Sequence, residues 1–535
     1  MSAQTNLYSS ASSMPVGVAG LDSGRFDAVV IGGGILGAGV ARELARRGLA
    51  TLLVERRDFA WGTTARSTRL IHGGLRYLAN YDLGVVREGL RERAWQLRRM
   101  PNLVTPLPFI LPFYHEPLWH RLRLRAGLTL YDLLSPRRSM PRHRFLSRSA
   151  AAAIEPGLST EGLSEAALYW DAQVELPERL VLDALRAAED AGAGVRNHVA
   201  ATGLRRDASG RVVGVELEAT LDGRSAVVSS GRVINATGPW ADVTLAGLGL
   251  DAAPLLRLVQ GIHVVYDRLA DHAVAFEHPD DRRLCFAVPW QGMTMIGTTE
   301  RDVLGGPDEA RVTRDEVAYL IRAANRVLPA SSGTGPLWGS VGVRSLIRES
   351  GIANRVSRRH LLVDHARDGA PGLTTVAGGK LTAWRSIAAE VVDELLDRRD
   401  RSALGDVDVG HLTLPPEPSA AAGPYAHRLW RLYGARATEV SAIADADTWW
   451  SLPLLPVGDA IRAEVAHALA VEWAQTLGDV VLRRMMLGFG PDLGRAAAEA
   501  VGAVALERLG WDTERVAREL AAFDIENLER RLEPA

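Results

Sequence analysis

Residues 26–55 read FDAVVIGGGILGAGVARELARRGLATLLVE, and this stretch decides the fold of the first half of the chain. Ala28–Ile31 is a short apolar run, which is typical of a buried parallel strand. The run breaks into the glycine pattern G-x-G-x-x-G over 32–37, and apolar residues then repeat at helical spacing. A second apolar strand, Thr51–Val54, ends at Glu55. Strand, glycines, helix, strand and acid in this order predict a Rossmann-type dinucleotide-binding unit.

The same residues indicate what this unit binds. The glycines let the backbone approach a pyrophosphate, whose charge is stabilised at the N-terminus of the helix that follows. The Glu55 carboxylate is placed to accept a hydrogen bond from a ribose hydroxyl, and it would repel a 2′-phosphate, so NADP is disfavoured. This much is shared by NAD and FAD sites.

The segment Asp58–Leu78, DFAWGTTARSTRLIHGGLRYL, separates the two cofactors. It is dense in glycine and small hydroxyl residues, whose backbone N–H groups suit a second phosphate and a flat ring. A nicotinamide enzyme usually continues into further strand–helix units instead. The segment therefore favours FAD.

Length and composition narrow the remaining function classes. The 535 residues predict three or four units at about 100–200 residues per domain. A net charge of −2 argues against bulk nucleic-acid binding, and the single Cys285 excludes a disulfide framework. The 13 histidines show no paired metal-ligand spacing, so no metal site is expected. We expect 1–24 to be a disordered tail that is not a signal peptide, and no apolar run predicts a transmembrane helix.

Further along the chain the pattern alternates and then becomes rich in strands. One helix pattern and three strand patterns follow one another at 180–191, 194–201, 212–219 and 232–236. The last strand ends in Thr237-Gly238 ahead of a helix, where small groups lie against a cofactor. Residues 250–365 then read as strands, including a hairpin at Gln291-Gly292, and suggest the sheet of a substrate-binding cap.

The C-terminal part reads as a return to the first domain followed by a separate helical domain. Gly378-Gly379 lets the chain pass close to a cofactor ring, and the helix predicted over 383–396 points its positive end at that ring. A Pro- and Ala-rich linker is expected at 401–425. Apolar spacing from Ile461 to Val480 predicts one amphipathic helix, and two more are expected at 492–509 and 512–522. Trp449, Trp450 and Trp511 are expected to be core residues, and nothing in this domain is predicted to be catalytic.

Four segments carry a resemblance to a known family: GGGILGAG (32–39), GTTARSTRLIHGGLRYL (62–78), INATGPWAD (234–242) and VAGGKLTAWR (376–385). In this order the chain resembles the FAD-dependent glycerol-3-phosphate dehydrogenases of the D-amino-acid-oxidase-like group. The resemblance implies an α/β fold with a Rossmann-type FAD-binding domain over 25–400, a β-rich cap interleaved in it (mainly 80–150 and 250–365), and an all-α C-terminal domain over 426–535. It implies oxidation of sn-glycerol 3-phosphate to dihydroxyacetone phosphate, with electrons passed to a membrane quinone.

Oxidation of a secondary alcohol needs a base for the hydroxyl proton, and histidine suits this near neutral pH. His263 is our first candidate, because RLVQGIHVV (257–265) keeps the histidine of the family's RLVKGSHIVV, and His72 is the second. Arg344 is placed to stabilise the alkoxide. Lys380 is the one lysine beside 61 arginines, and a compact ammonium suits a substrate phosphate.

The resemblance assigns further substrate contacts to Arg76, Tyr77 and Arg358. Together with the glycine pattern, it assigns cofactor contacts to Gly32, Gly34, Gly37, Glu55, Thr63, Ser67, His72, Gly73, Thr237, Gly238, Gly379, Leu381 and Thr382. Two segments depart from the family pattern. SRRH (357–360) replaces TRDY and adds positive charge, and RRMMLGF (483–489) replaces RRTRLGF. The first departure predicts a shifted phosphate pocket or a substrate with a different charged end.

Residues 115–148 are both basic and apolar. Their arginines are 121, 123, 125, 137, 138, 142, 144 and 148, interleaved with leucines and Trp119. Such a segment either lies in an anionic membrane interface or forms a solvated face of the cap, and we favour the membrane. The expected location is the cytoplasmic face of the cell membrane, with a second copy of the chain as a further expected partner. The rival functions are an oxygen-using oxidase of the same group, a flavoenzyme acting on another hydroxy acid or an amine, and a non-catalytic flavin-binding scaffold.

Overall fold

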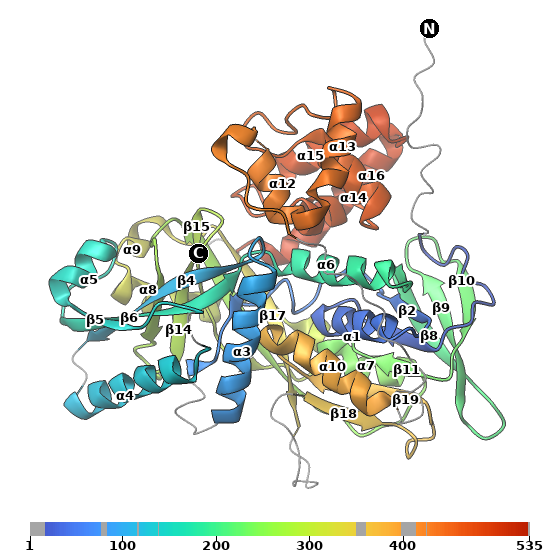
Figure 1. Cartoon of the computed structure of the whole chain (residues 1–535), viewed down its shortest axis with the longest axis horizontal. Coiled ribbons are helices and arrows are strands. Elements are labelled where there is room, and N and C mark those ends of the chain that lie inside the picture. Colours follow the sequence, from blue (N-terminus) through green and yellow to red (C-terminus); the bar gives the residue numbers. More distant parts are fainter. Residues whose placement is uncertain are drawn as a thin grey trace.

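The computed structural model describes residues 16–75, 83–114, 117–136, 139–348, 360–396, 414–423 and 425–532. They form three bodies (Figure 1): a six-stranded sheet with helices against it, a large sheet beside it, and a group of helices built from the residues after 425. We call them the N-terminal domain, the cap and the C-terminal helical domain. In the described part of the chain, no helix has both the length and the apolar character needed to cross a membrane.

The sheet of the N-terminal domain has the strand order β18-β19-β11-β1-β2-β7. Its strands are β1 (Ala28–Ile31), β2 (Thr51–Val54), β7 (Gly194–Arg196), β11 (Val233–Asn235), β18 (His360–Asp364) and β19 (Leu373–Gly378). All neighbouring pairs are parallel except β18 with β19. Strands β1, β2, β11 and β19 therefore end at one edge of the sheet, where open parallel sheets bind their ligands.

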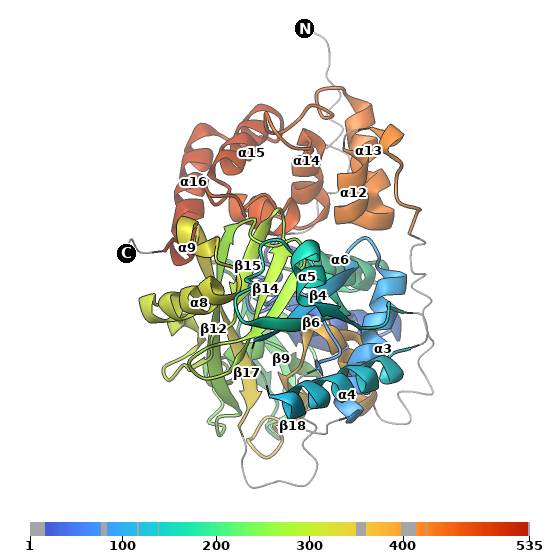
Figure 2. The ribbon, with the colours of Figure 1, turned by 90° about the vertical axis from the view of Figure 1, so that its left-hand side faces the viewer.

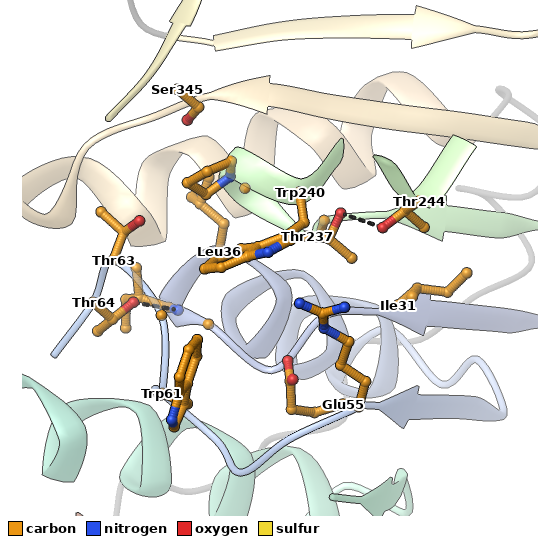
Figure 3. Close-up of a pocket in the computed structure, with 18 of the residues that line it drawn as sticks. Ile31, Leu36, Glu55, Trp61, Thr63, Thr64, Thr237, Trp240, Thr244 and Ser345 are labelled. Atoms are coloured by element: carbon orange, nitrogen blue, oxygen red, sulfur yellow. Dashed lines mark hydrogen bonds between the residues drawn. The ribbon is translucent and has the colours of Figure 1, made fainter. Parts of the chain in front are cut away.

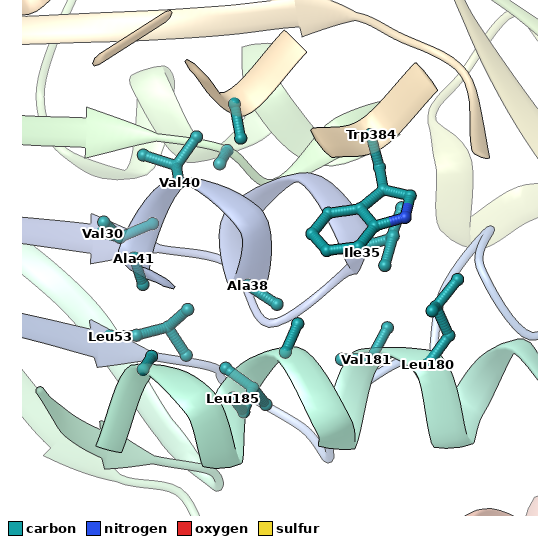
Figure 4. Packing of buried hydrophobic residues seen from close by; sticks show 14 of the residues in the cluster. Val30, Ile35, Ala38, Val40, Ala41, Leu53, Leu180, Val181, Leu185 and Trp384 are labelled. Carbon is teal, nitrogen blue, oxygen red and sulfur yellow. The ribbon is translucent and has the colours of Figure 1, made fainter. Parts of the chain in front are cut away.

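Three helices pack around the first strands, as Figure 4 shows. They are α1 (Ile35–Arg46), α6 (Pro177–Asp190) and α10 (Trp384–Leu395). Leu180 and Leu185 of α6 and Trp384 of α10 belong to the same buried cluster as Ala38 of α1. Gly39 permits the approach of α10, because a Cβ there would lie 2.9 Å from the Trp384 ring. This packing fixes the N-terminus of α1 at the end of β1.

The cap is a ten-stranded sheet in the order β16-β12-β15-β14-β13-β4-β6-β3, with β17 also paired to β12 and β5 to β6. Its strands are β3 (Leu70–Ile71), β4 (Val104–Tyr114), β5 (Arg144–Ser147), β6 (Leu163–Val174), β12 (Leu256–Asp267), β13 (Ala273–Glu277), β14 (Leu284–Trp290), β15 (Met293–Gly297), β16 (Arg301–Asp302) and β17 (Trp338–Ile347). The predicted hairpin at Gln291-Gly292 is confirmed, since β14 and β15 pair antiparallel around it.

The observed cap differs from the predicted ranges in two ways. Strands β3 and β6 lie inside the cap sheet although neither falls within the predicted segments 80–150 and 250–365. Strand β18 falls inside the predicted cap range, yet it pairs with β19 in the N-terminal sheet. Both differences are pairings between segments distant in sequence, which local patterns do not specify.

A small three-stranded sheet lies beside the N-terminal domain, formed by β8 (Val199–Arg206), β9 (Val212–Ala219) and β10 (Ser225–Ser229). The single strand predicted over 194–201 is wrong. The chain turns at His198, whose φ is +53°, so that β7 joins the parallel sheet and β8 begins the small one.

The C-terminal helical domain comprises α12 (Ala426–Tyr433), α13 (Ala437–Ala446), α14 (Arg462–Val471), α15 (Arg495–Arg508) and α16 (Thr513–Asn527). Figure 2 shows these helices on the opposite side of the cap from α4 (Leu118–Leu134). The continuous helix predicted over 461–480 is wrong, because α14 ends at Val471, and Trp473 just beyond it has a φ of +56°. A separate helical turn at Asp479–Arg484 follows the break.

Candidate active site

A pocket of about 460 Å³ lies at the edge of the N-terminal sheet where β1, β2, β11 and β19 end. Figure 3 shows it between the start of α1, the loop after β2 that carries Trp61 and Thr63, and the turn at Thr237. We call it the larger pocket. The predicted cofactor residues that line it are Gly32, Gly34, Glu55, Thr63, Ser67, Thr237, Gly238, Gly379 and Leu381.

The glycines are required where backbone segments meet. A Cβ on Gly32, whose φ is +113°, would lie 2.7 Å from the carbonyl oxygen of Ala236. Gly37 does not line the pocket: a Cβ there would lie 1.9 Å from the Gly32 carbonyl oxygen, so its role is close packing of α1 against β1. Gly379, with a φ of +102°, would place a Cβ 2.4 Å from Leu36. The chain therefore passes from β19 directly against the start of α1.

Glu55 is held in place by the backbone around it. The Gly33 N–H donates to Glu55 Oε2 at 2.7 Å, and the Arg57 N–H donates to Oε1 at 2.8 Å. Burial raises the pKa of this carboxyl above its usual value, while the two N–H groups act against that shift. Each oxygen keeps a lone pair beyond its N–H bond, so Glu55 can still accept from a ribose hydroxyl as the sequence predicts.

A smaller pocket of about 250 Å³ adjoins the larger one. The two share Thr63, Ser67, Lys380 and Leu381 in their linings. The smaller pocket also contains His72, Gly73, His263, Arg344 and Thr382. Residues far apart in the sequence, including the three predicted catalytic ones, thus line one space that opens beside the larger pocket.

His263 points into this space from β12 and is 3% exposed. Its Nε2 lies 2.9 Å from the Thr68 hydroxyl, and its Nδ1 is buried with no hydrogen-bond partner among the described residues. Burial, reinforced by Arg344 and Arg69, lowers the pKa of His263 to about 3. The imidazole is therefore neutral in the free protein at physiological pH and has a lone pair available to accept a proton.

Arg344 lies on β17, which pairs with β12. Its Nη2 donates to the Thr298 hydroxyl at 2.9 Å and its Nη1 to the Thr299 carbonyl at 3.3 Å. A Cβ on Gly261 would lie 2.6 Å from Arg344 Nη2, and one on Gly297 would lie 2.3 Å from the His263 ring. Two strand glycines thus create the space in which this cation and this imidazole lie side by side.

Lys380 follows β19 and precedes the short turn Leu381–Ala383 that opens α10. Its extended backbone carries the side chain to the junction of the two pockets, whose linings it shares. The N-terminal end of α10 faces the same region, which adds a partial positive charge. The one lysine of the chain therefore lies where both pockets meet.

The backbone of His72–Gly74 is held by a buried polar cluster that the sequence did not predict. The His72 N–H donates to the Thr382 hydroxyl at 3.1 Å, and the Gly73 N–H donates to the Tyr131 hydroxyl at 2.9 Å. Tyr131 in turn donates to Asp171 at 2.8 Å, and Arg93 donates to the same carboxylate at 2.6 Å. No local signal marks these residues. They come from three separate elements and meet only in the fold.

Thr68 was also missed, although it lies within the quoted segment 62–78, where its hydroxyl was counted only as part of a polar loop. The predicted substrate contacts Arg76, Tyr77 and Arg358 lie outside the described residues. The SRRH departure at 357–360 is described only at His360, which begins β18.

The larger pocket fits a dinucleotide. Its glycine-lined start of α1 suits a pyrophosphate, and its carboxylate at the end of β2 suits a ribose. Its far end is lined by Ser67, Gly379 and Lys380, small or cationic groups that suit a ring bearing negative charge when reduced.

Comparisons with known proteins agree with this reading. Residues 27–385 match the family model described as FAD dependent oxidoreductase, and residues 419–516 match the C-terminal domain of alpha-glycerophosphate oxidase. The chain is 35% identical over 528 residues to a glycerol-3-phosphate dehydrogenase of Synechocystis sp., covering 93% of this chain and 95% of that protein.

Solved structures support the same fold. A glycerol-3-phosphate dehydrogenase from Bacillus halodurans, complexed with FAD, has a TM-score of 0.75 at 24% identity and covers 96% of this chain and 97% of its own. An L-alpha-glycerophosphate oxidase from Mycoplasma pneumoniae with FAD bound has a TM-score of 0.53 at 17% identity, covering 69% and 94%. The predicted fold, a D-amino-acid-oxidase-like FAD-binding domain with a cap and a helical C-terminal domain, is confirmed.

Proposed function

Because the chain belongs to the FAD-dependent glycerol-3-phosphate dehydrogenase family, we propose that it oxidises sn-glycerol 3-phosphate to dihydroxyacetone phosphate and passes the electrons to a membrane quinone. The cofactor is FAD, which supplies the hydride acceptor when bound. The observation that carries the proposal is the junction of the two pockets, where Lys380, Arg344 and His263 line the space next to the dinucleotide site.

The two cations give the substrate its orientation. A phosphate beside Lys380 and Arg344 gains charge-assisted hydrogen bonds from an ammonium and a planar guanidinium. Arg344 is already fixed by Thr298 and Thr299, so little side-chain entropy is lost on binding. This anchoring turns the carbinol carbon toward the larger pocket.

His263 takes the hydroxyl proton in this scheme. Its low pKa in the free protein comes from burial and from two arginines, and a bound phosphate dianion offsets that positive charge. Substrate binding therefore raises the pKa of His263 toward the range in which a general base is effective. Thr68 fixes the ring through its hydroxyl at Nε2.

His72 is the rival base, since its side chain also lines the smaller pocket and is exposed there. Anaerobic stopped-flow reduction at saturating glycerol 3-phosphate distinguishes the two. We expect His263→Asn to slow flavin bleaching by about 10²–10⁴-fold, the usual contribution of a general base. His72→Asn is the matched control, and a larger loss in that variant would move the assignment to His72.

The substrate assignment is tested by the same titration without variants. Bleaching of the oxidised flavin band by sn-glycerol 3-phosphate supports it, whereas a flavin band left untouched by this compound but bleached by another hydroxy acid or an amine would refute it. Lys380→Arg keeps the charge but not the compact ammonium, so it should raise the substrate concentration for half-bleaching. A non-catalytic scaffold protein would bind FAD, but none of the substrates would bleach its flavin band.

The surface of the cap supports a membrane quinone as the electron acceptor. Helix α4 exposes Trp119, Leu122, Leu130 and Leu133 at spacings of three, eight and three residues, which places them on one stripe. Trp119 and Leu133 are 64% and 75% exposed. Arg123 is exposed beside this stripe, whereas Arg121 and Arg125 are paired with Glu165. An apolar stripe flanked by arginine suits an anionic membrane surface, where a quinone is available.

In this arrangement the enzyme lies on the cytoplasmic face of the membrane, with the α4 edge toward the lipid (Figure 1) and the C-terminal helical domain away from it. Co-sedimentation with phosphatidylglycerol vesicles tests this placement. Trp119→Gln with Leu133→Gln should reduce binding, while Leu304→Gln, which changes a 97% exposed leucine elsewhere on the cap, should not.

Turnover with a soluble quinone analogue and with oxygen separates a dehydrogenase from an oxidase. Faster reoxidation of the reduced flavin by the quinone analogue supports the proposal. Stoichiometric hydrogen peroxide in its place would assign an oxidase.

A further inference from the structure

A third cavity, of about 90 Å³, lies between the C-terminal helical domain and the rest of the molecule. We call it the aromatic cavity, because Trp61, Trp290, Trp338 and Phe489 line it. The turn Leu528–Arg530 after α16 closes one side and contacts β17 of the cap. Arg66, Ser67 and Arg69 line both this cavity and the smaller pocket, so the segment 66–69 separates the two.

One cation in the lining of the aromatic cavity has no carboxylate partner. Its lining contains four arginines and three glutamates. Arg66 pairs with Glu529 at 3.3 Å and Arg69 with Glu178 at 2.8 Å. Arg483 pairs with Glu526 at 2.5 Å and also with Asp58 and Asp479, which lie outside the lining. Within the described part of the chain, Arg530 is left as the lining cation without a carboxylate.

The Arg530 guanidinium is oriented but incompletely bonded. It lies over the Trp338 ring, 4.2 Å from its centre, and its Nη1 donates to the Asn527 side-chain oxygen at 2.9 Å. Its Nη2 is buried and makes no hydrogen bond to any described residue. Burial and the nearby Arg69 lower the pKa of this guanidinium to about 9. A buried donor without an acceptor costs about 1–3 kcal/mol, and more when the group is charged.

We propose that the aromatic cavity is a binding site for one small oxyanion of the phosphate or sulfate type, held by Arg530. The cavity offers a guanidinium nitrogen, Arg530 Nη2, that has no acceptor among the described residues, and four aromatic side chains in its wall. Its volume exceeds the ~30 Å³ that one water molecule takes in the liquid and allows for an ion of a few heavy atoms. The ion supplies the acceptor that Nη2 lacks.

Such a site couples the C-terminal helical domain to the active site. The anion joins Arg530, on the turn after α16, to the segment 66–69, whose Ser67 and Arg69 also line the smaller pocket. Binding therefore stabilises the docked C-terminal helical domain. Arg530 and Trp338 do not line the smaller pocket, so the site is separate from the one proposed for glycerol 3-phosphate and stands or falls independently of it.

Thermal unfolding of the FAD-loaded protein tests the proposal, with inorganic phosphate titrated against sodium chloride of matched ionic strength. We expect a saturable rise in Tm of about 2 °C with phosphate for the wild type, because a ligand stabilises the state that binds it. Arg530→Met should lose this rise. Arg531→Met is the matched control, since it removes the same charge from the next, exposed residue, and it should keep the rise.

Phosphate bound beside Lys380 and Arg344 is excluded by repeating the titration in Arg344→Gln, where the rise should persist, and in the double variant with Arg530→Met, where it should vanish. Without phosphate, Arg530→Met should unfold no lower than the wild type, because it removes a desolvated cation that has no carboxylate at ion-pair distance among the described residues. An equal phosphate response in Arg530→Met and Arg531→Met would overturn the proposal. A Tm several degrees lower in phosphate-free Arg530→Met would overturn it too, because it would show that the protein itself compensates this guanidinium.

Discussion

Removing Arg484 should weaken both the domain interface and the FAD site, because this residue holds the loop that lines the cofactor pocket. Asp58 lies at the start of that loop with its side chain fully buried. Arg484 donates to both its oxygens, from Nη1 at 2.6 Å and from Nη2 at 2.8 Å. Arg483 donates to the same carboxylate at 2.6 Å and Asn197 at 2.8 Å. The C-terminal helical domain thus clamps a carboxylate of the N-terminal domain.

The expected loss in free energy of unfolding follows from the buried charge that Arg484→Met leaves without its partner. Breaking a buried ion pair by removing one partner costs about 3–5 kcal/mol, since the remaining charge stays buried. Arg483 and Asn197 still contact Asp58 in the variant, so we expect the lower end, about 3 kcal/mol. Asp58→Asn should cost at least as much, because it leaves two buried guanidiniums facing a neutral amide. The double variant should cost less than the sum, because the two changes remove one interaction.

Flavin fluorescence during heating is the assay, since it reports release of FAD and loss of the loop together. About 3 kcal/mol corresponds to a Tm lower by roughly 3 °C if the whole chain unfolds as one unit, and by about 6–12 °C if a domain of about 150–250 residues unfolds alone. The matched control is Arg495→Met, which removes a surface arginine paired with Asp524 and Glu499 and should cost under about 1 kcal/mol. Equal effects of Arg484→Met and Arg495→Met, or strict additivity with Asp58→Asn, would refute the reasoning.

Three further outcomes follow from the same contacts. Burial lowers the pKa of His198, but the Asp479 carboxylate outweighs it and raises that pKa above its usual value. This pair therefore stabilises the fold fully below about pH 6.5, and its contribution is lost as the pH rises through the higher folded-state pKa. His198→Gln should lower Tm at pH 6 and much less at pH 9. Gly379→Ala should reduce FAD content in the purified protein, measured by the flavin-to-protein absorbance ratio, because the new Cβ would lie 2.4 Å from Leu36 at a φ of +102°. Gly333→Ala, in an open position that lines neither pocket, should not. Thr68→Val should lower the rate of flavin reduction about tenfold with little change in the substrate concentration for half-saturation, because it removes only the hydroxyl that orients His263. Thr68→Ser should restore the rate. An unchanged rate in Thr68→Val would show that Thr68 does not position His263.

The cofactor pocket was predictable because its parts are local. The run from Ala28 to Glu55 fixes a strand, a tight turn, a helix start and an acid within one supersecondary unit, so spacing alone places the pyrophosphate and ribose contacts. Gly37 shows the limit of that inference. The pattern predicts Gly37 as a cofactor contact, but in the structure its lack of a side chain lets α1 pack closely on the end of β1.

The smaller pocket was predictable only through resemblance, since its residues come from β12, β14, β17, the turn after β19 and two segments between β2 and β4. Their approach depends on pairings between strands that are distant in the sequence, which no local pattern contains. The glycines at 261 and 297 were the available signal, because a glycine inside a strand marks a close approach. The cluster of Tyr131, Asp171 and Arg93 had no such mark.

The RRMMLGF segment shows how a departure from a family pattern is interpreted once contacts are known. The two arginines that it retains, Arg483 and Arg484, are those that reach across to Asp58. The two residues that differ, Met485 and Met486, lie buried in the apolar cluster of the C-terminal helical domain. The charges needed for docking are therefore kept, while the substituted pair fills core volume, for which flexible methionine is well suited. In this structure the segment joins the two domains, and the departure leaves those contacts intact.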